Sequence, residues 1–464
     1  MNRRFAPRTQ RARARGPLTH LGQLVALGLV IASLTGVAHA NGAFPDEFSV
    51  HLPAGSPHRI LLGANFGLVI SEDDGATWRY VCEPYVVGAS ANAILYQLAP
   101  DGVMLAASLG YLTRSADEGC TWTHGGGSVS GLNLTDFFVD PNDPTFVLAI
   151  AFGLNGSAIY PSHDGGLTFG AALYTTPFFL TTIEIAASTP GVVYATLSSS
   201  TTDGGLGGPS LLRSADHGAT WSSYSLDVPP GTEARIAAVD PEDANTVYLR
   251  VLTSQTDALA ITTDGGKTLS PPAVSISGTV ISAFLRAGDG SVYVGTPGGD
   301  LYVRPPGATS FTRRPGPRLR CLGQRPGTSR IFACGDAFID GFNLGYSDDG
   351  GQSFKPLLRF NLLPPQRLVG PAPREGLATQ TLGPAEISGP LTCPPVPQAC
   401  AAHWTLLQTT LGILPDAGQP DGGGTTPPPP SNPGPQKSGC SSADGNAVAL
   451  LGLIVVLLLW RMRS

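Results

Sequence analysis

Short segments in which apolar residues alternate with polar ones recur through residues 45–360, separated by turns rich in Gly, Asp and Pro. Arg59 to Gly63 and Thr246 to Leu249 are typical. A period of two residues places alternate side chains on opposite faces of a strand, so the pattern predicts a succession of short β-strands. We therefore expect an all-β fold.

One turn motif, Ser-x-Asp-x-Gly-x-Thr-aromatic, recurs between these segments, and we call each copy a repeat turn. Its Asp is suited to accept hydrogen bonds from the N–H groups of its own turn. Its Gly supplies a positive φ, and its aromatic residue starts the next strand and packs between sheets. Four copies match in full and contain Asp73, Asp117, Asp164 and Asp216, followed by Trp78, Trp122, Phe169 and Trp221 respectively. Two looser copies contain Asp264 and Asp349, followed by Leu269 and Phe354.

The spacing of the repeat turns predicts the architecture. Successive aspartates are 44, 47, 52, 48 and 85 residues apart, and a period of about 40–50 residues marks a propeller or solenoid. Because the last spacing between aspartates is nearly twice the others, we expect one blade without the motif, at 279–314. The prediction is a seven-bladed β-propeller of four-stranded blades, with six or eight blades left open by the unassigned residues 360–412. The predicted blades are 45–84, 92–126, 132–174, 181–226, 234–274, 279–314 and 318–358.

The repeat turn resembles the Asp-box, or BNR repeat, of sialidases and related β-propellers, over roughly residues 45–360. The resemblance implies that each copy joins the third and fourth strands of a blade at the outer rim. It also implies a structural role for the aspartates and aromatic residues, far from the central channel where ligands usually bind.

The two ends of the chain predict export. Six arginines in the first fifteen residues, an apolar stretch from Leu21 to Val37 and the sequence Ala38-His39-Ala40 indicate a signal peptide at 1–40. The propeller region is 41–360, and a Pro-rich closing segment with one short helix is expected at 361–414. Residues 415–439 consist mainly of Pro, Gly and small polar residues, and are predicted to be an extended linker.

The tail, 440–464, combines Gly439-Cys440-Ser441, an apolar run from Ala447 to Trp460 and two arginines. It resembles the MYXO-CTERM sorting signal of myxobacterial exported proteins. That resemblance implies cleavage near Cys440 by a membrane sorting protease, display at the cell surface or outer membrane, and a lipid on Cys440. The alternative is a simple C-terminal transmembrane helix. Both interpretations tether the propeller outside the cytoplasm, to a membrane through the tail.

Cysteine content and charge agree with that location. Six cysteines remain beside Cys440, and an oxidising compartment favours disulfides. The expected pairs are Cys321–Cys334 on one hairpin, Cys393–Cys400 around a Pro-rich loop, and Cys82–Cys120 by default. Without the signal peptide and the tail, 20 basic and 33 acidic residues remain, a net charge of −13. The acidic balance argues against nucleic acid as a partner.

No catalytic residues are assigned. The resemblance to sialidases implies an arginine trio, a Tyr–Glu pair and an acidic residue. The family's Arg-Ile-Pro motif is absent, and Arg235, Arg286 and Arg320 begin strands without an assignable Tyr–Glu partner. The sequence contains no His-Glu-x-x-His, no Gly-x-Ser-x-Gly and no EF-hand spacing. We therefore expect no metal and no cofactor.

The sequence favours a non-catalytic binding or scaffold module for an extracellular protein or glycan. Variable loops on a rigid scaffold are the usual place for binding, and here they are expected on the face opposite the repeat turns, at 198–209, 152–158, 254–257 and 335–343. The alternative is a sialidase-like glycoside hydrolase acting on extracellular glycans. A third possibility is a periplasmic assembly factor like the photosystem II propeller.

Overall fold

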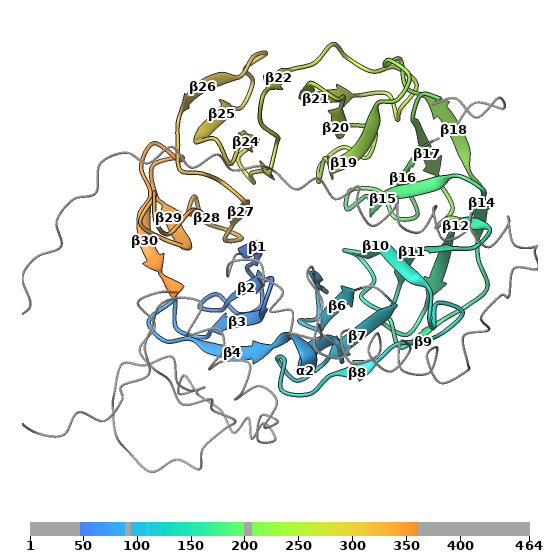
Figure 1. Cartoon of the computed structure of the whole chain (residues 1–464), viewed down its shortest axis with the longest axis horizontal. Helices are drawn as coiled ribbons and strands as arrows, with labels where there is room; N and C mark the ends of the chain where they lie inside the picture. Colours follow the sequence, from blue (N-terminus) through green and yellow to red (C-terminus); the bar gives the residue numbers. More distant parts are fainter. Residues whose placement is uncertain (1–46, 89–93, 109, 199–206, 361–464) are drawn as a thin grey trace, which may run out of the picture. The chain divides into compact units, whose positions relative to one another are not determined.

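The computed structural model describes residues 47–88, 94–108, 110–198 and 207–360. These residues form seven antiparallel sheets of four strands, blades 1 to 7, which follow one another around a ring. In Figure 1 the blades run from blue in blade 1 through green to orange in blade 7. The predicted seven-bladed β-propeller is confirmed.

Each blade is one continuous stretch of chain. Blade 1 consists of β1 (Glu47–His51), β2 (Ile60–Ala64), β3 (Gly67–Ser71) and β4 (Arg79–Cys82). Blade 2 consists of β5 (Leu95–Leu98), β6 (Met104–Ser108), β7 (Tyr111–Ser115) and β8 (Thr123–His124). Blade 3 consists of β10 (Asn133–Val139), β11 (Val147–Gly153), β12 (Gly156–Ser162) and β14 (Tyr174–Thr176). Blades 4 and 5 consist of β15 (Phe179–Ile185), β16 (Val193–Ser198), β17 (Ser210–Ser214) and β18 (Ser222–Ser225); and β19 (Glu233–Val239), β20 (Val247–Leu252), β21 (Thr256–Thr262) and β22 (Val274–Ser277). Blades 6 and 7 consist of β23 (Ala283–Arg286), β24 (Val292–Gly295), β25 (Asp300–Arg304) and β26 (Thr312–Pro315); and β27 (Cys321–Gln324), β28 (Ile331–Cys334), β29 (Leu344–Ser347) and β30 (Lys355–Leu358).

Three further elements lie between these strands: α2 (Glu83–Val87), β9 (Gly126–Gly127) and β13 (Thr168–Phe169). The sequence did not indicate them. The blade without a repeat turn, expected at 279–314, is present as β23 to β26.

The hydrophobic core is divided among the junctions between blades. One cluster of buried side chains lies at each of the seven junctions. The second strand of a blade has a neighbouring blade on both faces, so every residue of β2, β6, β24 and β28 is buried. A strand covered on both faces carries a continuous apolar run instead of an alternating one.

Side-chain packing closes the ring. The first strand of each blade contacts the first strand of the next, and β1 contacts β27 and β28. Among the described residues, no strand from one end of the chain completes a sheet begun at the other end. Blades 7 and 1 meet instead through an apolar cluster that includes Phe332, Leu358, Ile60 and Leu62. The Arg325–Asp74 ion pair, at 2.7 Å, adds a polar contact between the same two blades.

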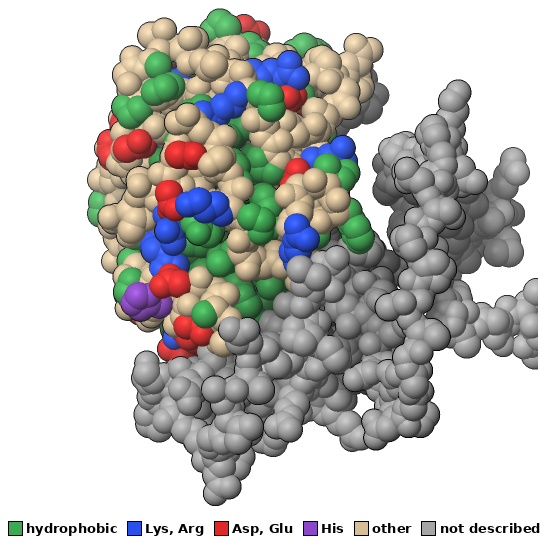
Figure 2. Space-filling view, turned by 90° about the vertical axis from the view of Figure 1, so that its left-hand side faces the viewer, with side chains coloured by type: hydrophobic (Ala, Val, Ile, Leu, Met, Phe, Trp, Pro, Cys, Tyr) green, Lys and Arg blue, Asp and Glu red, His purple; other side chains and the backbone are tan. Residues whose placement is uncertain are grey.

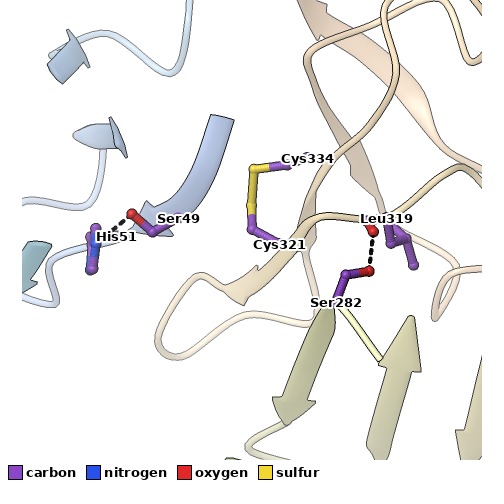
Figure 3. Close-up of a disulfide and its surroundings, with 6 residues drawn as sticks. All are labelled: Ser49, His51, Ser282, Leu319, Cys321 and Cys334. Atoms are coloured by element: carbon purple, nitrogen blue, oxygen red, sulfur yellow. Dashed lines mark hydrogen bonds between the residues drawn. A yellow bond between two sulfur atoms is a disulfide. The ribbon is translucent and has the colours of Figure 1, made fainter. Parts of the chain in front are cut away.

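The predicted disulfide between Cys321 and Cys334 is confirmed, and it joins directly paired residues of β27 and β28. Figure 3 shows this bond beside Ser282, whose hydroxyl donates to the carbonyl oxygen of Leu319 and so links blade 6 to the chain entering blade 7. Cys82 and Cys120 are disulfide-bonded as well. Their predicted bond to each other stays a prediction.

Several predicted segments lie outside the described residues: the signal peptide at 1–40, the closing segment at 361–414 with Cys393 and Cys400, the linker at 415–439 and the tail with Cys440. Within the described part of the chain, no helix has the length and apolar character needed to cross a membrane.

A short parallel pair of strands fastens the connection after blade 2 to the repeat turn of blade 3. Gly126 N donates to Leu167 O at 2.9 Å, and Ser128 N donates to Phe169 O at 3.0 Å. Gly127 between them has a φ of +80°, and a Cβ there would lie 2.3 Å from the oxygen of Phe169. The pair therefore needs glycine at position 127.

We expect Gly127→Ala to lower the free energy of unfolding by about 1–3 kcal/mol, because alanine is strained at this φ and its Cβ displaces β13. Gly126→Ala is the matched control, since a Cβ at Gly126 has its nearest neighbour 3.9 Å away. Urea denaturation measures both. Equal stability of the two variants would contradict this account of the strand pair.

Candidate functional site

The direction of the strands gives the ring two different faces. Within each blade the second strand runs antiparallel to the first, and the third to the second. The loops between second and third strands and the connections to the next blade therefore lie on one face, the loop face. The repeat turns and the turns between first and second strands lie on the other, the turn face. Each repeat turn joins the third and fourth strands of its blade, for example β3 and β4.

The repeat turns share one hydrogen-bond pattern. The carboxylate of Asp164 accepts from Thr168 N at 2.8 Å, from Thr168 Oγ1 at 2.5 Å and from Ser162 Oγ at 2.7 Å. The Ser162 hydroxyl in turn accepts from Gly166 N at 2.9 Å. The same bonds form at the other five copies, around Asp73, Asp117, Asp216, Asp264 and Asp349. The hydrogen bonds expected at these aspartates are therefore present.

At two of the turns these hydrogen bonds strongly favour the ionised carboxylate. Bonds from Thr220 lower the pKa of Asp216 to about 2, and bonds from Thr268 lower the pKa of Asp264 to about 2. A carboxylate that accepts several donors favours its charged form. The carboxylate oxygens of these aspartates are hydrogen-bonded within their own turns.

Each repeat turn also contacts the preceding blade. Gly166 has a φ of +86°, and a Cβ there would lie 2.7 Å from Leu105 of blade 2. The aromatic positions add to this packing: the side chains of Trp78 and Phe169 are buried, and the indole of Trp221 donates to Gly218 O at 2.8 Å. Trp122 and Phe354 pack against the clusters of their own blade junctions. The repeat turns thus contribute to the packing of one blade on another.

The loop face carries most of the exposed large apolar side chains. Nine large apolar side chains are exposed among the described residues, and strand direction places all but Leu167 on the loop face. The eight on the loop face are Phe48, Leu95, Phe152, Leu154, Phe179, Val280, Phe338 and Ile339. Exposed apolar side chains gathered on one face mark an interaction surface.

Two parts of this surface are well defined. At blades 3 and 4 the rings of Phe152 and Phe179 meet edge to face with centroids 5.5 Å apart, and Leu154 is fully exposed at the tip of the β11–β12 loop. At blade 7 the loop 335–343 presents Phe338 and Ile339. Because Asp336 Oδ1 accepts from the backbone N–H groups of both residues, this loop is held in one shape.

The loops expected from the sequence are partly corrected. The loop at 152–158 is shorter than predicted, because β11 and β12 extend to Gly153 and from Gly156. The loop at 254–257 also ends early, since β21 begins at Thr256. The loop at 335–343 has the expected bounds, whereas residues 199–206 of the loop at 198–209 lie outside the described residues.

The three arginines considered for a sialidase-like site do not gather at one point. Arg235 lies in the part of β19 nearest the loop face and pairs with Glu233 at 2.6 Å. Arg320 precedes β27 on the same face, and burial lowers its pKa. Arg286 lies at the turn-face end of β23, where its guanidinium pairs with Asp240 at 2.9 Å.

Polar side chains on the innermost strands link one blade to the next. An innermost strand pairs along one edge only, so the N–H groups of its other edge need acceptors. Val139 N donates to Gln97 at 3.1 Å, Ile183 N to Asp136 at 2.9 Å, and Val239 N to Glu184 at 2.8 Å. In each case the acceptor belongs to the preceding blade.

Burial raises the pKa of Asp136 to about 7 and that of Glu184 to about 8. Both side chains retain some exposed surface, but the surrounding blades remove most of the water that would stabilise their charge. Sequence reasoning missed these two residues. The available signal was a single acidic residue inside each of two otherwise uncharged strands. In the described part of the chain no group of three or more His, Cys, Asp or Glu residues is arranged to hold a metal ion.

The rim carries paired charges. On the side shown in Figure 2, Lys and Arg side chains stand next to Asp and Glu side chains, and no large region of one sign forms. Arg330 and Lys355 both contact Asp348, at 2.7 and 3.3 Å, and Arg313 contacts Asp300 at 2.8 Å. Exposed pairs of this kind contribute little stability.

No protein-family model matches the chain, and no curated protein matches it. Among solved structures it is similar to YCF48 bound to D1 peptide, with 16% identity over 48% of this chain and 68% of that one and a TM-score of 0.34. The extracellular domain of the putative one component system BT4673 from B. thetaiotaomicron is 14% identical over 68% of this chain and 42% of its own, with a TM-score of 0.47. Kuenenia stuttgartiensis hydrazine synthase is 10% identical over 68% and 99%, with a TM-score of 0.48.

Proposed function

We propose that this chain is an exported, surface-tethered β-propeller that binds an extracellular protein through its loop face and catalyses no reaction. The observation that carries the proposal is the gathering of eight exposed apolar side chains on that face. Leu154, Val280 and Ile339 offer no hydrogen bonds to sugar hydroxyls, so the surface suits an apolar protein segment better than a glycan. Anchors of this kind supply most of the affinity of protein interfaces.

The chemistry of the charged residues supports a non-catalytic role. The carboxylates of the repeat-turn aspartates accept hydrogen bonds within their own turns. Arg286 pairs with Asp240 on the turn face, opposite Arg235 and Arg320. The sialidase-like alternative needs these arginines to converge on one substrate carboxylate.

Export and tethering rest on the two ends of the chain and on its cysteines. The signal peptide at 1–40 directs secretion, and the MYXO-CTERM-like tail places the protein on the cell surface after processing near Cys440. The disulfides at Cys82, Cys120 and Cys321–Cys334 are consistent with an oxidising compartment.

A matched pair of substitutions in blade 3 tests the binding surface. Leu154 on the loop face and Leu167 on the turn face are both exposed leucines. In a pull-down from the surface fraction of the native cells, we expect Leu154→Asp to weaken partner retention about tenfold or more, because it places a charge in an apolar contact. Leu167→Asp should retain the partner. Loss with Leu167→Asp alone would contradict the proposal.

The hydrolase alternative predicts a different result. We expect no turnover of sialyl or other glycoside probes by the purified protein. Turnover that disappears in Arg235→Ala, while the circular dichroism spectrum and melting temperature are kept, would establish the alternative instead.

A further inference from the structure

One position of the repeat turn has a left-handed backbone in every copy. It is the residue directly after the aspartate, and its φ lies between +57° and +74° in all six copies. Glycine adopts this conformation without steric cost, whereas other residues are strained by it. Three copies have glycine at this position and three have a longer residue: Gly165, Gly265 and Gly350 against Asp74, Glu118 and His217. Within the described residues, the last three are the only non-glycine residues with a positive φ.

Two of the strained side chains form ion pairs with the preceding blade. The carboxylate of Asp74 in blade 1 contacts Arg325 of blade 7 at 2.7 Å, and that of Glu118 in blade 2 contacts Arg59 of blade 1. Both arginine side chains are largely buried. Each lies in the turn between the first and second strands of its blade.

At the third strained copy the contact is aromatic. The ring of His217 in blade 4 meets the ring of Phe146 of blade 3 edge to face, with centroids 5.5 Å apart. Phe146, like the two arginines, lies in the turn between the first and second strands of its blade. The same relation between neighbouring blades therefore recurs at three junctions with three different pairs of side chains.

At the glycine copies an arginine of the preceding blade reaches the turn instead. A Cβ at Gly265 in blade 5 would lie 3.1 Å from Nε of Arg213 in blade 4. At Gly350 in blade 7 the backbone oxygen accepts a hydrogen bond from Nη2 of Arg314 in blade 6. Glycine thus leaves room for the side chain that comes from the other side of the junction.

The third glycine copy shows that the two sides of a junction are matched in sequence. A Cβ at Gly165 in blade 3 would lie 3.4 Å from Nε of Arg114 in blade 2. Arg114 and Arg213 each directly precede the first residue of the repeat turn of their own blade. In blades 1 and 3, which precede a non-glycine copy, Ile70 and Pro161 occupy that position.

We propose that the residue after each repeat-turn aspartate forms a latch between neighbouring blades, and that the latch has two matched forms. In one form a strained side chain of the turn reaches back to the preceding blade. In the other form glycine admits an arginine of the preceding blade. The contact offsets the cost of the strained backbone and makes each turn specific for the blade before it. The blades are therefore not interchangeable, and the inference does not depend on the partner of the loop face.

Asp74→Gly in the full chain tests the first form by the sign of its effect. If residue 74 were only a strained turn residue, glycine would relieve the strain and raise the urea midpoint. The latch predicts a lower midpoint, with the unfolding equilibrium constant raised about fivefold or more, because Arg325 loses its ion pair. A midpoint that stays equal or rises would overturn the proposal.

The Arg325→Leu background is the control for this substitution. Without the arginine, Asp74→Gly should lose most of its destabilising effect, since the remaining contact of Asp74, with His58, is exposed. Equal destabilisation in the two backgrounds would show that the contact between blades 7 and 1 is not the cause, and the proposal would be wrong.

Gly265→Ala tests the second form. It should lower the urea midpoint through strain at a φ of +74° and through crowding against Arg213. In the Arg213→Ala background only the strain remains, so the decrease should be smaller. The same decrease in both backgrounds would contradict the matching of glycine and arginine across the junction.

Discussion

Replacing Phe137 with alanine is expected to lower the free energy of unfolding by about 3–5 kcal/mol, the range for removing a buried phenyl ring. Phe137 in β10 is fully buried in the cluster between blades 2 and 3. The cavity is bordered on both sides by strands that are held in their own ladders, so the neighbouring side chains have little freedom to fill it. Chemical denaturation followed by tryptophan fluorescence measures the loss.

Phe152→Ala is the matched control. The residue lies in the next strand of the same blade, but its ring is exposed on the loop face. Its loss should change stability by less than about 1 kcal/mol, while weakening retention of the partner. Equal destabilisation by the two substitutions would mean that the division between core and binding surface is wrong.

Stability is expected to fall as the pH rises from about 4 to about 8, because the native state holds two protons that the unfolded chain has released. Burial raises the pKa of Asp136 to about 7 and that of Glu184 to about 8. A raised acid pKa means that the native state binds more protons than the unfolded state over that window. Arg235 partly offsets the shift at Asp136, and Asp136 adds to the shift at Glu184.

The double variant Asp136→Asn with Glu184→Gln should flatten this dependence. The amide oxygens still accept from Ile183 N and Val239 N, but nothing ionises. Because each unit of pKa shift corresponds to about 1.4 kcal/mol, the variant should be more stable than the wild type at pH 9 by at least about 3 kcal/mol. The difference in stability between the variant and the wild type should be smaller at pH 5.

The repeat turns provide a control in which stability depends on pH in the opposite direction. Hydrogen bonds lower the pKa of Asp216 to about 2. The stability that these bonds contribute is therefore present above the pKa that Asp216 has in the unfolded chain, and it is lost as the pH falls toward 2. Asp216→Asn should therefore reduce stability at neutral pH and have less effect in acid. Parallel slopes for the wild type and the double variant between pH 5 and 9 would contradict the account of Asp136 and Glu184.

The repeat turn made the architecture predictable because it combines a carboxylate acceptor, a positive-φ glycine and an aromatic residue at fixed offsets. Each of these requirements is local, so each copy can be read in isolation. The blade at 279–314 lacks the motif and was still found from its strand spacing, since period-two patterns are also local.

The proposed binding surface was predictable only in part: the loops at 152–158 and 335–343 were expected to bind a partner, but the contribution of Phe179 was not. Phe179 has the sequence context of an ordinary strand residue, as does the buried Phe137. Their exposure depends on where the neighbouring blade ends, which no local pattern records. Similarly, Asp136 fits an alternating strand as a solvent-facing residue, but the next blade covers it.

Photo-crosslinking from a single position tests the proposed binding surface most directly. p-Benzoylphenylalanine is placed at Leu154 in one protein and at Leu167 in another, and each is irradiated on the native cell surface. The account predicts a discrete covalent adduct with one partner protein from position 154 and none from position 167. An adduct from position 167 alone, or no difference between the two positions, would contradict it.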